Sequence, residues 1–100
     1  MITDSLLTKT QLIRASDMLK AMSHPIRVSI LYLLKDGDKK TVAEIQECIN
    51  IEQSTASHHL GILKDRGILC SKRDGKNIYY YTKHAIFGQF LECMYSCSCD

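Results

Sequence analysis

The chain has 100 residues, of which 45% are hydrophobic and 24% are charged, and its formal net charge is +2. This length fits one domain with a modest core, so pairing with a second copy would add stability. The longest apolar run, residues 30–34, is far too short to cross a bilayer, and the N-terminus lacks the features of a secretory signal. We therefore expect a cytoplasmic protein without membrane contact.

Two helices are predicted in the first third of the chain. Helical periodicity runs from about Leu6 to Met22, where Ser23-His24-Pro25 interrupts it. A second helix is predicted from Pro25, because proline is tolerated in the first helical turn. Its apolar stripe comprises Val28, Ile30, Leu31, Leu33 and Leu34, and turn-forming residues 36–38 end it.

The pattern of a helix-turn-helix follows over about residues 41–66. Thr41-Val42-Ala43-Glu44 predicts a capping box at the start of a short helix. Asn50-Ile51-Glu52 predicts a tight turn. The next helix is expected from about Gln53 to Arg66, with Gly67 as its C-terminal cap.

This last helix has two faces of opposite character. At about 100° per residue, Ser54, Ser57, His58 and Gly61 lie on one side, and the apolar Ala56, Leu60 and Leu63 lie on the other. The first side is small, polar and free of carboxylates until Asp65. The second helix of a helix-turn-helix enters the major groove of DNA, where such side chains contact bases or phosphates.

A β-hairpin and a final helix complete the chain. Residues 68–73 and 76–82 flank Asp74-Gly75, a strong hairpin signal. Positive charge gathers here, since residues 53–77 carry five Lys/Arg and two Asp/Glu, whereas residues 1–52 carry seven of each sign. The basic tip suits a wing that lies over phosphates. With a last helix over about residues 84–97, the predicted order is α-α-α-α-β-β-α, a single α+β winged helix-turn-helix domain.

Three motifs stand in order along the chain: Ser23-His24-Pro25-Ile26-Arg27-Val28-Ser29-Ile30-Leu31, Ser54-Thr55-Ala56-Ser57-His58-His59-Leu60-Gly61-Ile62-Leu63 and Arg73-Asp74-Gly75-Lys76-Asn77-Ile78-Tyr79-Tyr80. They resemble the opening, the recognition helix and the wing of the arsenic-repressor (ArsR/SmtB) family of winged-helix repressors. The resemblance extends from about Leu19 to Thr82. It implies a homodimeric repressor, not an enzyme, that binds a palindromic double-stranded DNA operator and dissociates when an inducer binds.

The resemblance also assigns residues to these roles. Major-groove contacts fall on Gln53, Ser54, Thr55, Ser57 and His58, and wing contacts on Lys72, Arg73, Lys76 and Asn77. Family members dimerise through their first and last helices. The stripe Phe87, Phe90, Leu91 and Met94 suits that interface, although the same pattern suits a core within one chain.

The five cysteines are odd in number, which argues against a closed disulfide framework. Cys48 and Cys70 are expected to be small buried hydrophobic residues. Cys93 and Cys97 share a helical face, and Cys99 follows closely. These three thiols fit a sensor of thiophilic ions such as As(III), Sb(III), Cd(II) or Cu(I). They equally fit a disulfide or polysulfide sensor of oxidants or reactive sulfur, or a regulator that binds no ligand.

The chain departs from the best-known metal sites of the family. The third helix lacks a thiol near its start, and at most His84, Cys97 and Asp100 remain for an interhelical zinc site. His24 and His59 are expected to cap or pack. The competing class is a winged-helix module that binds protein, which would usually lack a basic, polar face. No catalytic motif is present.

Overall fold

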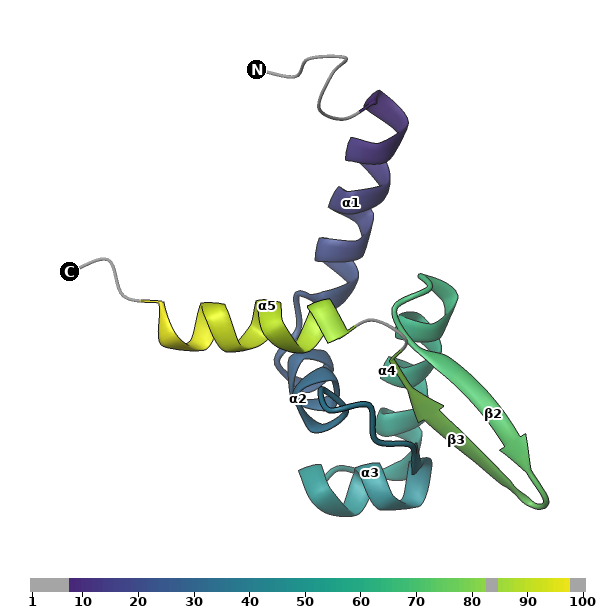
Figure 1. The fold of residues 1–100 in the computed structure, drawn as a ribbon. Helices are drawn as coiled ribbons and strands as arrows, with labels where there is room; N and C mark the ends of the chain where they lie inside the picture. Colours follow the sequence, from purple (N-terminus) through teal and green to yellow (C-terminus); the bar gives the residue numbers. More distant parts are fainter. Residues whose placement is uncertain (1–7, 83–84, 98–100) are drawn as a thin grey trace.

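The computed structural model describes residues 8–82 and 85–97. Its elements are α1 (Lys9–Met22), α2 (Pro25–Leu33), β1 (Lys40–Thr41), α3 (Val42–Ile49), α4 (Gln53–Asp65), β2 (Cys70–Asp74), β3 (Asn77–Tyr81) and α5 (Ala85–Ser96) (Figure 1). The predicted winged helix-turn-helix is confirmed. The short strand β1 was not predicted.

Side-chain caps set the helix boundaries. Thr8 and Gln11 form a capping box on α1, and His24 Nδ1 accepts the Ile26 N–H at the start of α2. The predicted box on α3 is present, with Thr41 and Glu44 each accepting the other's N–H. The N–H of Thr41 thereby lowers the pKa of the Glu44 carboxyl. These contacts satisfy donors that every helix start leaves open.

The three strands form an antiparallel sheet in the order β1-β3-β2. Thr41 of β1 lies opposite Tyr79 of β3. Asp74 and Asn77 are paired across the hairpin, so the turn residues are Gly75 and Lys76 and not the predicted Asp74 and Gly75. Gly75 has φ +65°, as required of the first central residue in a two-residue hairpin turn.

The core lies where α2, α3 and α4 meet the base of the hairpin. Its fully buried side chains are Ile30, Leu31, Leu34, Ile45, Leu60, Leu63, Ile68 and Leu69. The predicted apolar face of α4, which comprises Ala56, Leu60 and Leu63, is therefore confirmed. Val28, which was placed in the apolar stripe of α2, is instead exposed.

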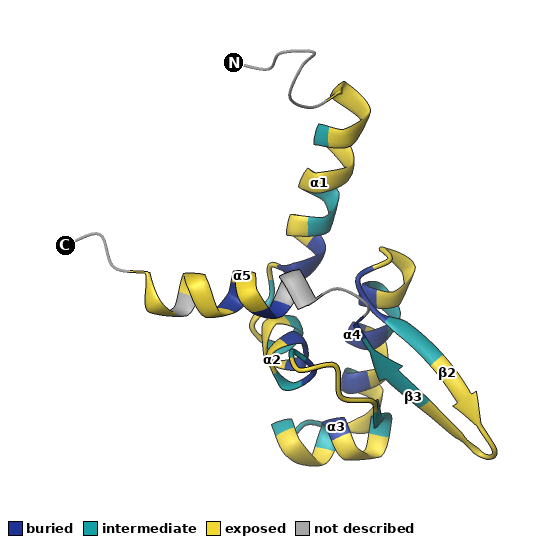
Figure 2. Ribbon diagram, viewed as in Figure 1, coloured by how far each residue is buried: buried dark blue, intermediate teal, exposed yellow. Residues whose placement is uncertain are grey.

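Helices α1 and α5 extend from this core as two arms (Figures 1 and 2). The two arms join the core through Ala21, Met22 and Leu91, whereas other positions along the same helices carry exposed apolar residues. These exposed residues are Ile13, Leu19, Phe90 and Met94. Across the described part of the chain, every helix falls short of the length and apolar character needed to cross a bilayer.

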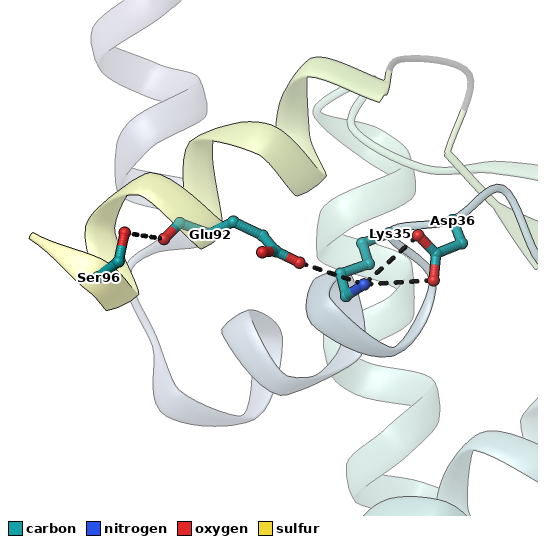
Figure 3. A network of polar contacts seen from close by, with 4 residues as sticks. All are labelled: Lys35, Asp36, Glu92 and Ser96. Atoms are coloured by element: carbon teal, nitrogen blue, oxygen red, sulfur yellow. Dashed lines mark hydrogen bonds and ion pairs between the residues drawn. The ribbon is translucent and has the colours of Figure 1, made fainter.

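Lys35, just after α2, joins the core to α5 (Figure 3). Its ammonium lies 3.2 Å from carboxylate oxygens of both Asp36 and Glu92. Hydrogen bonds to these two groups raise the pKa of Lys35. Gly88 permits the close approach, because a Cβ built there would lie 2.8 Å from Lys35 Cβ and 3.0 Å from its carbonyl oxygen.

Candidate nucleic-acid interface

The outward side of α4 is polar and exposed, as predicted. Gln53, Ser54, Ser57 and His58 are exposed and Thr55 is half-buried, whereas Ala56, Leu60 and Leu63 are fully buried. The apolar residues hold the helix against the core, so the side facing solvent is made of hydroxyl, amide and imidazole groups. Contact of these residues with DNA stays a prediction.

The N-terminus of α4 adds backbone donors to this face. Its N-cap is Glu52, whose side chain makes no capping hydrogen bond. The first-turn N–H groups of a helix attract anions such as phosphate. They lie beside the exposed Gln53 and Ser54, so this end of α4 suits contact with a DNA backbone.

The hairpin of β2 and β3 projects from the body as a wing (Figure 1). Lys72, Arg73, Lys76 and Asn77 are all exposed near its tip, and the tip is the most open part of the sheet (Figure 2). At its base, the Lys39 ammonium lies 5.2 Å from the centre of the Tyr81 ring. A fixed base and a charged tip suit a wing that follows phosphates.

The two adjacent histidines of α4 have different surroundings. His58 is exposed, and His59 is buried with 6% of its surface accessible. Arg27 Nε donates to His59 Nδ1 at 3.1 Å, and the His24 and His59 rings lie 4.4 Å apart. Burial, followed by the nearby charges of His24 and Arg27, lowers the pKa of His59. The packing role predicted for His24 and His59 is confirmed, but their link to Arg27 was missed.

The cysteines are only partly covered by the structure. Cys93 and Cys97 are exposed, and the Cys97 N–H donates to the Met94 carbonyl at 3.3 Å. Cys99, His84 and Asp100 lie outside the described residues, so neither the three-thiol site nor the His84, Cys97 and Asp100 site is tested. Within the described ranges no cluster of three potential ligands is suited to a metal ion.

Two expectations about the other thiols differ from the structure. Cys48 is exposed, so its predicted burial is wrong, and Cys70 is half-buried. The inward stripe of α3 is filled by Val42, Ile45 and Ile49. Cys48 lies about 100° from Ile49 around the helix axis, which turns its side chain toward solvent.

An apolar groove of about 970 Å³ lies between α1, α2 and α5. Leu19, Val28, Tyr32, Phe90 and Met94 are among its lining residues, and all five are exposed large hydrophobic side chains. Of the predicted stripe on the last helix, Leu91 belongs to the core of this chain, whereas Phe90 and Met94 are uncovered. The side chain of Phe87 lies outside the described residues.

Comparison with known proteins gives consistent matches. The profile of a family described as "Bacterial regulatory protein, arsR family" matches residues 24–71. The transcriptional repressor SdpR of Bacillus subtilis is 45% identical over 65 residues, which cover 65% of this chain and 71% of SdpR.

Two solved structures are similar over most of their length. The transcriptional repressor BigR from Xylella fastidiosa superposes with a TM-score of 0.76 at 29% identity, covering 90% of this chain and 93% of BigR. The homodimeric winged helix-turn-helix DNA-binding domain of Mb0332 from Mycobacterium bovis gives a TM-score of 0.77 at 25% identity. The match covers 95% of this chain and 87% of the Mb0332 domain.

Proposed function

Since this chain belongs to the arsR family of bacterial regulatory proteins, we propose that it represses transcription as a homodimer on a palindromic operator. Membership makes it a DNA-binding transcriptional regulator with a winged-helix fold, and not an enzyme. Our proposal concerns three points: which residues contact the operator, how the protein dimerises and what induces its release from DNA.

The observation that carries the proposal is the outward polar face of α4 beside a basic wing. Ser57 and His58 lie in the exposed middle of α4, where a helix in the major groove meets base edges. Gln53, Ser54 and Thr55 stand at its N-terminal end, where backbone donors and side chains suit phosphate and base contacts. The wing adds the charge of Lys72, Arg73 and Lys76, with Asn77 as a polar neighbour.

The dimer is supported by the two arms. Their uncovered apolar residues, together with the groove between α1, α2 and α5, form the kind of patch that a partner surface covers. The similar Mb0332 domain is described as homodimeric. A twofold dimer would present two copies of α4 to two half-sites, which matches a palindromic operator.

We propose further that the C-terminal cysteines release the protein from DNA. Cys93 is exposed on α5 and Cys97 follows within one helical turn, and exposed thiols are available to soft ions such as As(III) or Cd(II). Oxidation or persulfidation of the same thiols is the alternative chemistry. In both cases the modified helix is α5, whose Glu92 forms an ion pair with Lys35 of the core.

The operator proposal is tested by binding to a duplex selected from a random-sequence library with the wild-type protein. Ser57→Ala and His58→Ala should each weaken binding about tenfold, the loss expected for about one good polar contact. Cys48→Ser, at an exposed position on α3 that is assigned neither to the recognition face nor to the dimer, is the control and should bind like the wild type. Unchanged melting temperatures would show that folding is intact. Wild-type affinity in both α4 variants would refute the proposed recognition face.

The sensing proposal is tested by titrating arsenite, Cd(II) and a persulfide donor onto the DNA complex. The wild type should dissociate with at least one of them, and Cys93→Ser should stay bound. Cys48→Ser removes another exposed thiol, on α3, and should behave as the wild type. Native mass spectrometry would separate metal loading from sulfur addition. If none of the three reagents releases DNA, the C-terminal thiols are not a sensor of these classes.

A further inference from the structure

One guanidinium connects three helices. Arg27, in the first turn of α2, donates through Nη1 to the carbonyl oxygen of Ala21 at 2.9 Å. Through Nε it donates to Nδ1 of His59 at 3.1 Å. Ala21 belongs to the last turn of α1 and His59 to the middle of α4. The contact therefore joins the arm that carries α1 to the helix that we propose reads DNA.

His59 is held from several sides. Its ring packs on His24 with centroids 4.4 Å apart and on His58 at 5.2 Å. His24 is itself fixed, because its Nδ1 accepts the Ile26 N–H at 3.1 Å. Arg27 and His24 both lie outside α4, and their hold on this buried imidazole leaves α4 little freedom to rotate about its axis. Such rotation would change where the neighbouring His58 and the outward face point.

The geometry also defines the protonation state of His59. Since Arg27 is a donor only, the His59 Nδ1 that faces it must be an acceptor, so the imidazole is neutral and carries its proton on Nε2. Protonation at Nδ1 would remove the acceptor and place a second cation beside Arg27. The same argument does not apply to His58, which is exposed on the outward side.

We propose that Arg27 and His59 position α4 for DNA binding, and that only the neutral imidazole of His59 does so. This inference rests on the proposed role of the outward face of α4. Arg27 and His59 are positioning residues, since they lie beneath that face and act through the orientation of the helix.

The charged groups that shift the pKa of His59 come from α2, from its N-cap and from α4 itself. The pKa of His59 is lowered by burial first, then by His24, Arg27 and His58, and none of these causes raises it. Helix α1 contributes the Ala21 carbonyl through Arg27, while its charged Arg14 and Asp17 lie with Asp65 and Arg66 at the far end of α4. DNA affinity should therefore be highest at neutral pH and fall in acid. The fall should occur at a pH below the ordinary histidine pKa, where His59 binds a proton.

A matched pair of substitutions separates the two histidines. His59→Asn retains an oxygen acceptor near the position of Nδ1 but has no titration, and His58→Asn makes the same change one residue away. Affinity for the selected duplex is measured between pH 5 and 8 at constant ionic strength. We expect His59→Asn to bind within about threefold of the wild type at pH 7.5 and to lose the weakening in acid. We expect His58→Asn to bind more weakly than the wild type and to keep the weakening in acid, because His59 is intact.

Two further measurements distinguish a positioning role from a general loss of structure. Arg27→Lys keeps the charge but cannot reach both acceptors with the planar fork, so affinity at pH 7.5 should fall about tenfold, the loss expected for one charge-assisted contact. Imidazole ¹⁵N spectra of the free protein should show the Nε2–H tautomer of His59 at pH 7.5, whatever a variant does to folding. A proton on Nδ1, or an unchanged acid response in His59→Asn, would overturn the inference. Failure of the wild type to select any duplex would instead overturn the proposed function and the inference with it.

Discussion

The two helical glycines Gly88 and Gly61 offer a direct test of how α5 packs. An alanine Cβ at position 88 would lie 2.8 Å from Lys35 Cβ, 3.0 Å from its carbonyl oxygen and 3.3 Å from its Cα. Carbon atoms in contact prefer about 3.5–4.0 Å. Neither the backbone nor the Cβ of Lys35 is a flexible side-chain end, so α5 must move away and strain the 3.2 Å contact of Lys35 with Glu92.

The magnitude follows from two opposing terms. Replacing a glycine within a helix by alanine favours the helix by about 1 kcal/mol, whereas overpacking a close contact costs about 1–3 kcal/mol. Gly61→Ala is the matched control, because its Cβ meets nothing within 4 Å. The propensity gain cancels between the two variants, so the free energy of unfolding should be about 1–3 kcal/mol lower for Gly88→Ala than for Gly61→Ala.

Urea unfolding followed by circular dichroism measures this difference. The protomer concentration must be the same in all samples, because association stabilises the folded state. Gly61→Ala alone should raise the melting temperature by about 4–8 °C. If both variants are stabilised equally, α5 does not dock against Lys35 and the close approach at Gly88 is refuted.

Three further outcomes are expected. Thr41→Ala removes the hydroxyl that accepts the Glu44 N–H, while the backbone N–H of residue 41 can still donate to Glu44. It should lower the free energy of unfolding by about 0.5–2 kcal/mol. Thr10→Ala, at an exposed position within α1, removes no helix cap and should not lower it. Lys76→Ala should weaken DNA binding on all sequences and reduce the slope of log K against log salt by about 0.9 if the ammonium neutralises one phosphate, whereas an unchanged slope would remove Lys76 from the interface. The His59 contribution to stability is complete above about pH 6.5 and is lost as the pH falls below it, because the unfolded imidazole binds a proton that the buried one resists; urea unfolding of His59→Asn should lack this loss.

Local patterns predicted most of the architecture because each has a short-range cause. The Thr41 and Glu44 capping box, the left-handed Asn50 at the end of α3 and the positive φ of Gly67 all depend on neighbours within a few residues. The apolar face of α4 was equally predictable from helical spacing. Exposure of Ser57 and His58 follows from that face, so the surface position of the candidate site was also predictable.

The predictions that failed depend on how segments pair and pack against one another, which spacing along the chain does not specify. Strand β1 has two residues, too few for an alternating pattern, and it exists because β3 pairs with it. The hairpin turn shifted by one residue because the strand register places the positive φ of Gly75 at the first turn position. Arg27 and His59 are 32 positions apart, and no local signal joins them. For Cys48, a small apolar residue on a short helix was assigned to a core already filled by its neighbours.

Thr41 belongs to two structures at once. It is the last residue of β1, where it lies opposite Tyr79, and it is also the N-cap of α3. The wing and the helix pair α3–α4 therefore share an anchor and cannot shift independently. In the proposed dimer, one protomer would thus recognise a half-site of fixed length, while the dimer surface on α1, α2 and α5 would set the separation between half-sites. Mutations in the arms would change the distance between half-sites that the dimer prefers, without changing which bases each half-site contains.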